Sequence, residues 1–100
     1  MSDSIKALKM PKWGMAMKNG TIIAWLVEEG AHLDIGAEIM EIENEKVTGV
    51  YESPVEGRLR QRLVSAGDTV PVGSLLGVVA AAATADERID EFVARFAQSQ

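Results

Sequence analysis

The amino-acid sequence predicts an all-β sandwich or barrel followed by one short helix. Nine glycines divide the first 80 residues into short segments, and no segment before residue 84 keeps a helical period over three turns. Residues 38–43 alternate polar and apolar side chains, and residues 21–27 are mainly apolar, so both segments are expected to be strands. Many short strands separated by glycine turns are typical of a sandwich or a barrel.

An internal repeat relates the two halves of this region. When the chain is shifted by 37 residues, segment 20–27 aligns with 57–64 and segment 30–36 aligns with 67–73, and both glycines and apolar positions coincide. Two copies are too few for a solenoid. The repeat therefore predicts a pseudo-two-fold β fold in which neither half can bury its apolar face alone.

The join between the two copies lies near Asn44 to Val47 and includes Lys46. Judged from composition alone, Lys46 would be an ordinary solvated lysine in an acidic turn. The repeat instead places it on the tight turn between the halves. Such a turn would fix the backbone while leaving a four-carbon side chain free to swing, an arrangement that suits a tethered carrier group.

A different pattern begins at Ala80, where small residues replace the strand pattern. Thr84 or Asp86 can cap a helix, and acidic residues are favoured in its first turn. Apolar residues then recur at helical spacing, which predicts an amphipathic helix over residues 86–98; the stripe consists of Ile89, Phe92, Val93 and Phe96. We divide the chain into a domain over 1–81, a linker over 82–85 and this helix, interpreted as the junction to a further domain.

The composition narrows the possible functions. With 15 acidic and 10 basic residues, the net charge of −5 argues against a nucleic-acid partner. The absence of cysteine excludes disulfides and thiolate metal sites, and the single histidine excludes a multi-histidine metal site. The sequence contains neither a signal peptide nor an apolar run near the ~20 residues of a membrane helix. We expect a cytoplasmic protein without membrane contact, metal ligands or catalytic residues of its own.

An ordered set of motifs resembles the lipoyl domains of 2-oxo acid dehydrogenase complexes. The resemblance covers about residues 4–81 and implies a flattened barrel of two four-stranded antiparallel sheets with quasi-two-fold symmetry. It also implies that Lys46 carries lipoate through an amide bond, with Glu45 and Val47 flanking it for presentation. The matching residues are Met10, Pro11, Gly14, Met17, Gly20, Ile22, Trp25, Gly30, Gly36, Ile42, Glu43, Glu45, Lys46, Ser53, Pro54, Gly57, Gly67, Asp68, Val70 and Gly73.

The resemblance further implies a swinging-arm carrier and its partners. Lipoate on Lys46 would accept an acyl group, expected to be acetyl, from a thiamine-diphosphate-dependent component (E1) and deliver it to coenzyme A at an acyltransferase domain. Dihydrolipoamide dehydrogenase would reoxidise the dithiol, and a lipoate ligase or lipoyl transferase would attach the group. The segment from Met10 to Met15 is similar to that of acetyltransferase (E2) components of bacterial acetoin dehydrogenase systems, and the pyruvate and branched-chain complexes stay open as alternatives.

Two alternatives share the fold. Biotinyl carrier domains of carboxylases or decarboxylases have methionine on both sides of the modified lysine, whereas Glu45 and Val47 stand here and favour lipoate. The usual lipoyl sequence at this turn is Asp-Lys-Ala. Here Glu45 replaces the aspartate and keeps a carboxylate, and Val47 replaces the alanine and keeps an apolar side chain. The second alternative is an unmodified barrel domain that acts in protein interaction, such as an adaptor of a secretion or efflux system.

Three other features of the sequence are the segment 13–19, the single histidine and three alternating arginines. The resemblance places residues 13–19 near the Lys46 turn, where they could help partner enzymes recognise the domain. His32 aligns with Thr69 of the second copy, between two glycines, and is expected to be an exposed turn residue; no catalytic base–nucleophile pair is evident. Arg58, Arg60 and Arg62 alternate and are interpreted as the solvated face of a strand.

Overall fold

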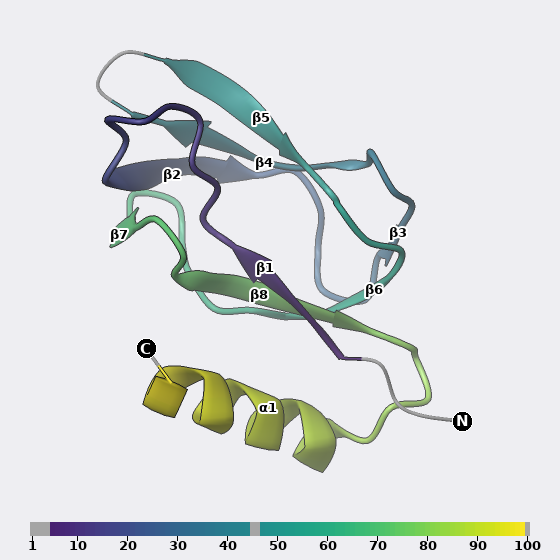
Figure 1. Ribbon diagram of the computed structural model, residues 1–100. Coiled ribbons are helices and arrows are strands. Elements are labelled where there is room, and N and C mark those ends of the chain that lie inside the picture. The colour runs from purple at the N-terminus through teal and green to yellow at the C-terminus, as the bar shows by residue number, and fades with distance from the viewer. Residues whose placement is uncertain (1–4, 45–46, 100) are drawn as a thin grey trace.

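The computed structural model describes residues 5–44 and 47–99. Within these residues the chain forms eight strands and one helix (Figure 1). In chain order they are β1 (Lys6–Lys9), β2 (Asn19–Trp25), β3 (His32–Leu33), β4 (Glu38–Glu43), β5 (Thr48–Glu52), β6 (Gly57–Arg62), β7 (Thr69–Pro71), β8 (Leu75–Ala80) and α1 (Asp86–Ser99).

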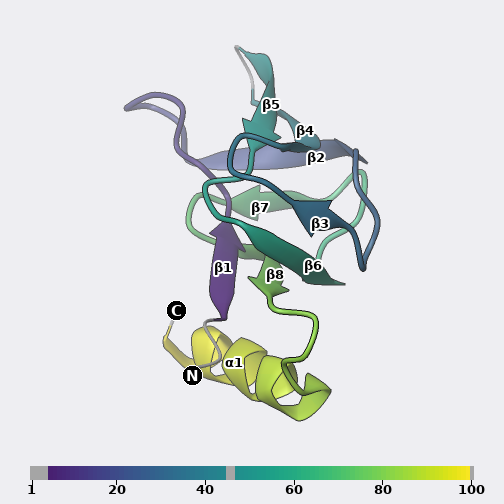
Figure 2. The same ribbon diagram turned by 90° about the vertical axis from the view of Figure 1, so that its right-hand side faces the viewer.

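The strands form two four-stranded antiparallel sheets that face each other (Figures 1 and 2). One sheet has the order β1-β8-β6-β3 and the other has the order β5-β4-β2-β7. Exchanging β1 with β5, β8 with β4, β6 with β2 and β3 with β7 converts one order into the other. The all-β class, the two four-stranded sheets and the quasi-two-fold symmetry are therefore confirmed.

The glycine turns repeat the same symmetry in their backbone angles. Gly30 and Gly67 have φ values of 95° and 96°, and Gly36 and Gly73 have values of 91° and 90°. Such angles are strained for residues that carry a Cβ atom, so glycine is favoured at both members of each pair. The equivalence detected in the sequence is thus an equivalence of local conformation.

The main core lies between the sheets and draws on both. Ile22, Ile39 and Ile42 of one sheet and Leu8 and Leu59 of the other are fully buried. Burying a side chain of this size stabilises a fold by roughly 1.5–3 kcal/mol relative to leaving it in water. Each sheet thereby covers the apolar face that the other leaves open.

Helix α1 packs on the outer face of the β1-β8-β6-β3 sheet (Figure 2). Ile89 is 3% exposed and forms a second apolar cluster with Val78 and Ala80 of β8, against which Phe92 and Val93 also pack. Because β8 is covered on both faces, its last five residues are all buried. The predicted apolar stripe therefore meets the domain itself.

The start of α1 differs from the predicted caps. The backbone amides of Arg88 and Ile89 donate to the carbonyl of Ala85, so Ala85 occupies the capping position. The Thr84 hydroxyl is buried and has no hydrogen-bond partner within residues 5–44 and 47–99. Asp86 instead receives a hydrogen bond from Arg60 on β6, at 2.8 Å between Nη2 and Oδ1. This ion pair fixes the first turn of the helix against the sheet.

Candidate functional site

The hairpin of β4 and β5 is the element that presents the predicted site. Its two strands are paired through Glu41 with Val50, Ile42 with Gly49 and Glu43 with Thr48. Ile42 is fully buried in the main core, so the base of the hairpin is anchored there. Pairing and anchoring together fix the register at the end of the hairpin, because a one-residue slip would turn Ile42 outward.

Two hydrogen bonds close the described part of this hairpin. The Asn44 amide donates to the Val47 carbonyl at 2.8 Å, and the Val47 amide donates to Asn44 Oδ1 at 2.7 Å. Two residues separate Asn44 from Val47 in the sequence. They are Glu45 and Lys46, both candidate site residues, and they lie outside the described residues. Val47, the third candidate, is 48% exposed.

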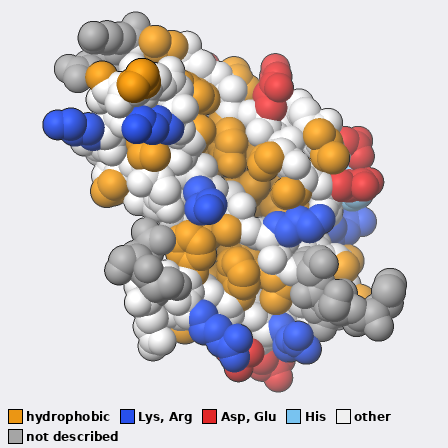
Figure 3. Space-filling model, in the orientation of Figure 1, with side chains coloured by type: hydrophobic (Ala, Val, Ile, Leu, Met, Phe, Trp, Pro, Cys, Tyr) orange, Lys and Arg blue, Asp and Glu red, His pale blue; other side chains and the backbone are white. Residues whose placement is uncertain are grey.

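The loop before β2 lies beside the base of the hairpin. Residues 13–19 and Glu43, Asn44 and Val47 line one surface hollow of about 860 Å³. Met17 is buried and fixes the loop to the core, whereas Met15 is 96% exposed. Figure 3 shows hydrophobic side chains beside basic ones at this end of the molecule, at the upper left. The loop and the hairpin thus form one continuous surface.

Trp13 of this loop approaches the hairpin at Gly49. A Cβ atom added to Gly49 would lie 3.1 Å from Cζ3 and 3.2 Å from Cη2 of the Trp13 ring. These distances are shorter than ordinary van der Waals contacts, so the ring approaches the β5 backbone because Gly49 has no side chain. The position of the loop therefore depends on this glycine in the hairpin.

One ionisable group of the hairpin itself, Tyr51 in β5, has a shifted pKa. Burial raises the pKa of the Tyr51 phenol above its ordinary value of 10.0, while a backbone hydrogen bond with Lys9 acts in the opposite direction. The Tyr51 hydroxyl is therefore protonated near pH 7 and cannot act as a base. Its role is packing against the main core.

His32 lies in the short strand β3, away from the end of the hairpin that carries Asn44 and Val47 (Figure 1). Its side chain is 50% exposed, which agrees with the expected exposure, although it belongs to a strand and not to a turn. Its Nε2 atom lies 3.2 Å from Asp34 Oδ1 and 3.7 Å from Glu56 Oε2. The structure therefore separates the only histidine of the sequence from Asn44 and Val47, the described end of the hairpin.

The interpretation of the arginines as a solvated strand face is wrong for Arg60, whereas Arg58 and Arg62 are exposed as expected. A register shift between Leu59 and Gln61 interrupts the alternation of β6. Arg60 is only 14% exposed in its side chain, and it donates to the Ala81 carbonyl as well as to Asp86. Arg58 donates to the Gly30 carbonyl, and the Arg62 guanidinium lies 5.6 Å from the Trp25 ring centroid. These arginines stabilise contacts between segments.

The chain matches a family of known domains over most of its length. The family model described as "Biotin-requiring enzyme", for biotin and lipoyl domains, matches residues 6–79. The chain belongs to the biotin/lipoyl domain family. The match includes the β4–β5 hairpin and both sheets, whereas α1 lies beyond it.

Relatives of this biotin/lipoyl domain include components of acetoin cleaving systems. The dihydrolipoyllysine-residue acetyltransferase component of Cupriavidus necator is 44% identical over 96% of this chain, and that of Pseudomonas putida is 39% identical over 94%. The chain spans only 26% and 25% of the lengths of these two proteins. The lipoyl domain of the 2-oxoglutarate dehydrogenase complex from Azotobacter vinelandii is 27% identical, with a TM-score of 0.60 over 73% of this chain and 92% of that domain.

No helix in the described part of the chain is both long enough and apolar enough to cross a membrane.

Sequence reasoning missed the tertiary roles of Arg60 and β8. A signal for β8 was available, since residues 75–80 form an almost continuous apolar run, which is typical of a strand buried on both faces. That run and the helical stripe together indicate that the two elements pack on each other. No local pattern indicated the pairing of Arg60 with Asp86.

Proposed function

We propose that this chain is a lipoyl carrier domain in which Lys46 bears lipoate through an amide bond. The observation that supports this most directly is the closed hairpin base, where Asn44 and Val47 bond to each other across an interval of two residues that includes Lys46. The names of the two acetoin-system relatives, both dihydrolipoyllysine-residue acetyltransferase components, support the same assignment.

The surroundings of the hairpin fit a group that extends away from the domain. The interior between the sheets is filled by buried side chains, and the hollow next to the hairpin lies on the surface. Glu43 and Val47 are exposed on either side of the interval. When bound, lipoate would supply a dithiolane that carries acyl groups and electrons. The chain's own contribution is a fixed base from which a long, flexible arm extends.

The identity of the complex is the finer part of the proposal. The acetoin-system relatives favour an acetyl group, received from a thiamine-diphosphate-dependent component and passed to coenzyme A at an acyltransferase. Dihydrolipoamide dehydrogenase would then complete the cycle. The acyltransferase activity and the interactions with these partners would be properties of the whole protein, in which this chain would be the carrier domain. Tethering would hold the arm near each partner at an effective concentration of about a millimolar.

The loop of residues 13–19 is proposed to take part in recognition by these partners. It shares a hollow with the hairpin, and its Met15 side chain is almost fully exposed. An exposed methionine next to the carrier arm offers an adaptable apolar contact. A partner that accepts the arm would meet this loop at the same time.

Biotin attachment is the second candidate, since the matching family model carries the description "Biotin-requiring enzyme". Glu45 and Val47, instead of methionines, flank Lys46 and favour lipoate. A direct comparison decides between the two: the chain is incubated with lipoate ligase and lipoate, or with biotin ligase and biotin, each with ATP. Intact mass is then measured, and one added lipoyl group with no added biotin is expected.

Three variants locate the modified residue. Lys46→Ala and Lys46→Arg should gain no lipoyl group, because neither offers a primary amine. Lys18→Ala is the matched control, since Lys18 lines the hollow beside the hairpin and should not be needed for modification. A lipoyl group on Lys46→Ala, or its loss from Lys18→Ala, would contradict the assignment of Lys46. If the unaltered chain gained biotin but no lipoyl group, the chain would be assigned as a biotinyl carrier domain instead.

A further inference from the structure

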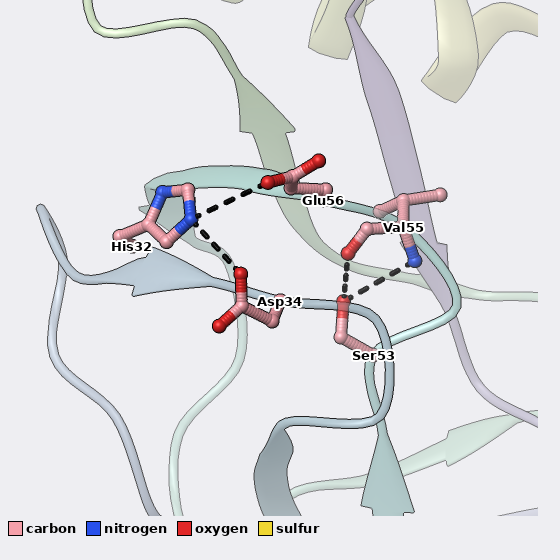
Figure 4. Close-up of polar contacts among 5 residues, drawn as sticks. All are labelled: His32, Asp34, Ser53, Val55 and Glu56. Carbon is pink, nitrogen blue, oxygen red and sulfur yellow. Dashed lines mark hydrogen bonds and ion pairs between the residues drawn. The ribbon is translucent and has the colours of Figure 1, made fainter.

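Three side chains that could bind a metal ion meet on the opposite side of the molecule from the hairpin end. His32 Nε2 lies 3.2 Å from Asp34 Oδ1 and 3.7 Å from Glu56 Oε2, and one possible ligand atom from each residue lies within 4.8 Å of the other two (Figure 4). His32 and Asp34 come from β3 and the loop after it, whereas Glu56 immediately precedes β6. The three residues therefore converge from two separate segments.

Backbone contacts hold these two segments together. The pairing of β3 with β6 places His32 opposite Arg58 and Leu33 opposite Gly57. Ser53 donates its backbone amide to Ala37 at 2.7 Å and accepts a hydrogen bond from the Gly36 amide at 2.8 Å. The cluster is thus built on a frame whose geometry does not depend on the three side chains.

Ser53 also orders the turn that carries Glu56. It is 2% exposed, and its hydroxyl donates to the Val55 carbonyl at 2.6 Å (Figure 4). The Val55 amide returns a hydrogen bond to the same hydroxyl at 3.3 Å. Because this local network fixes the backbone next to Glu56, little ordering is required before that carboxylate can act as a ligand.

The charges at the cluster favour a cation. Two carboxylates lie near one imidazole nitrogen, and that nitrogen has at most one hydrogen to donate. Exposed ion pairs of this kind contribute only about 0–1 kcal/mol. A divalent cation could bind the nitrogen lone pair and both carboxylates at the same time. The nearby Arg58 guanidinium is occupied by the Gly30 carbonyl at 2.8 Å and is not aimed at the carboxylates by any contact described.

Two of the three spacings in the cluster are close to those of a zinc site. Zinc binds imidazole nitrogen and carboxylate oxygen at about 2.0–2.2 Å, so neighbouring ligand atoms in a tetrahedral site lie roughly 3.3–3.6 Å apart. The two separations measured from His32 Nε2, 3.2 and 3.7 Å, lie close to this range. An open hollow of about 380 Å³ beside His32 and Glu56, which Lys6 and Arg58 also line, leaves room for water at the remaining position.

We propose that His32, Asp34 and Glu56 form a binding site for a divalent cation of the zinc type. One nitrogen and two oxygen ligands suit such an ion, whereas Mg²⁺ and Ca²⁺ prefer oxygen alone. This site departs from the expectation that the chain has no metal ligands. A bound ion would tie the loop after β3 to the turn before β6. It would act independently of Lys46, since the cluster lies away from Asn44 and Val47, the described residues on either side of Lys46 in the sequence.

The test uses the unmodified chain without an affinity tag, because dithiols and histidine tags bind zinc themselves. Zinc chloride is titrated into the protein and followed by calorimetry and by the NMR signals of the imidazole ring. The chain has one histidine and no cysteine, so the imidazole signals report on His32 alone. We expect one equivalent of zinc to bind, with saturable shifts of that ring and of the amides of residues 32–34 and 55–57. Magnesium chloride should produce no such shifts.

Single substitutions then identify the ligands. His32→Gln, Asp34→Asn and Glu56→Gln should each weaken zinc binding by at least ~10-fold, the smallest effect usual for losing even an indirect partner of a metal site. All three positions are exposed, so circular dichroism should show an unchanged fold. Asp90→Asn, at an exposed carboxylate of α1, is the control and should bind zinc like the unaltered chain.

Two results would overturn the proposal. One is the absence of saturable binding in the unaltered chain, and the other is binding that all three ligand variants retain at full strength. Lys46→Ala should bind zinc normally. A negative zinc result would therefore leave the proposed carrier function intact, and a negative lipoylation result would leave the proposed zinc site intact.

Discussion

Replacing Ile89 by alanine tests whether helix α1 is part of the folded domain. Ile89 is 3% exposed and lies in the apolar cluster formed with Val78 and Ala80 of β8. Replacing a buried isoleucine by alanine removes apolar contacts and leaves a cavity, which costs about 2–5 kcal/mol. An isolated helix of 14 residues is marginal in water, so its order depends on this docking surface.

The expected effect can be expressed as a melting temperature. In a domain of this size, a loss of 1 kcal/mol lowers Tm by about 4–8 °C. Ile89→Ala should therefore lower Tm by at least ~8 °C if the helix and the barrel unfold together. Circular dichroism at the helix minimum and tryptophan fluorescence should report the same midpoint, since the tryptophans belong to the barrel side of the molecule.

Asp90→Ala is the matched control, since Asp90 neighbours Ile89 on α1 but is exposed. It should change the free energy of unfolding by no more than about ±0.5 kcal/mol, as a typical surface substitution does. If Ile89→Ala were as stable as Asp90→Ala, the cluster between α1 and β8 would contribute nothing to the cooperative unit. A helix signal that melts before the fluorescence signal would show that the helix undocks separately.

Two further predictions concern the helix and the loop. A chain that ends after Ala83 should keep a folded barrel and a Lys46 that lipoate ligase modifies, but with a lower Tm because Val78 and Ala80 lose their cover; a chain that unfolds, or that is no longer modified, would show that α1 is essential to the domain. Met15→Ala should leave lipoylation and Tm unchanged, because Met15 is 96% exposed, but should slow acyl transfer to the lipoylated chain from its thiamine-diphosphate-dependent partner. An unchanged transfer rate would remove Met15 from the recognition surface.

Much of the fold could be read from local patterns. The segment 38–43 predicted as a strand corresponds to β4, although a register shift between Glu38 and Met40 breaks the alternation and leaves Ile39, Met40 and Ile42 all fully buried. The repeat relied on glycines, and the paired φ values at Gly30 and Gly67 show why these positions are equivalent. Both signals are local because side-chain alternation and backbone angles are properties of short segments.

Only part of the candidate site could be predicted from local patterns in the sequence. The sequence directed attention to Lys46 and its neighbours, and the closed pair of Asn44 and Val47 is consistent with a tight turn there. Lys46 and Glu45 lie outside the described residues, so their roles remain predictions. The contact of Trp13 with Gly49 could not have been anticipated, since it depends on the path of a loop that has no repeating pattern.

The sequence by itself determined the glycine turns, the strand over residues 38–43, the two-fold relation between the halves and the apolar stripe of the helix. Only the tertiary structure decided that the stripe packs on β8, that Arg60 pairs with Asp86, and that His32 meets Glu56. The physical reason is the distance along the chain between these partners. Periodicity records which side chains share a face, but not which distant segment covers that face. That choice follows from how the two sheets and the helix pack to bury their apolar surfaces together.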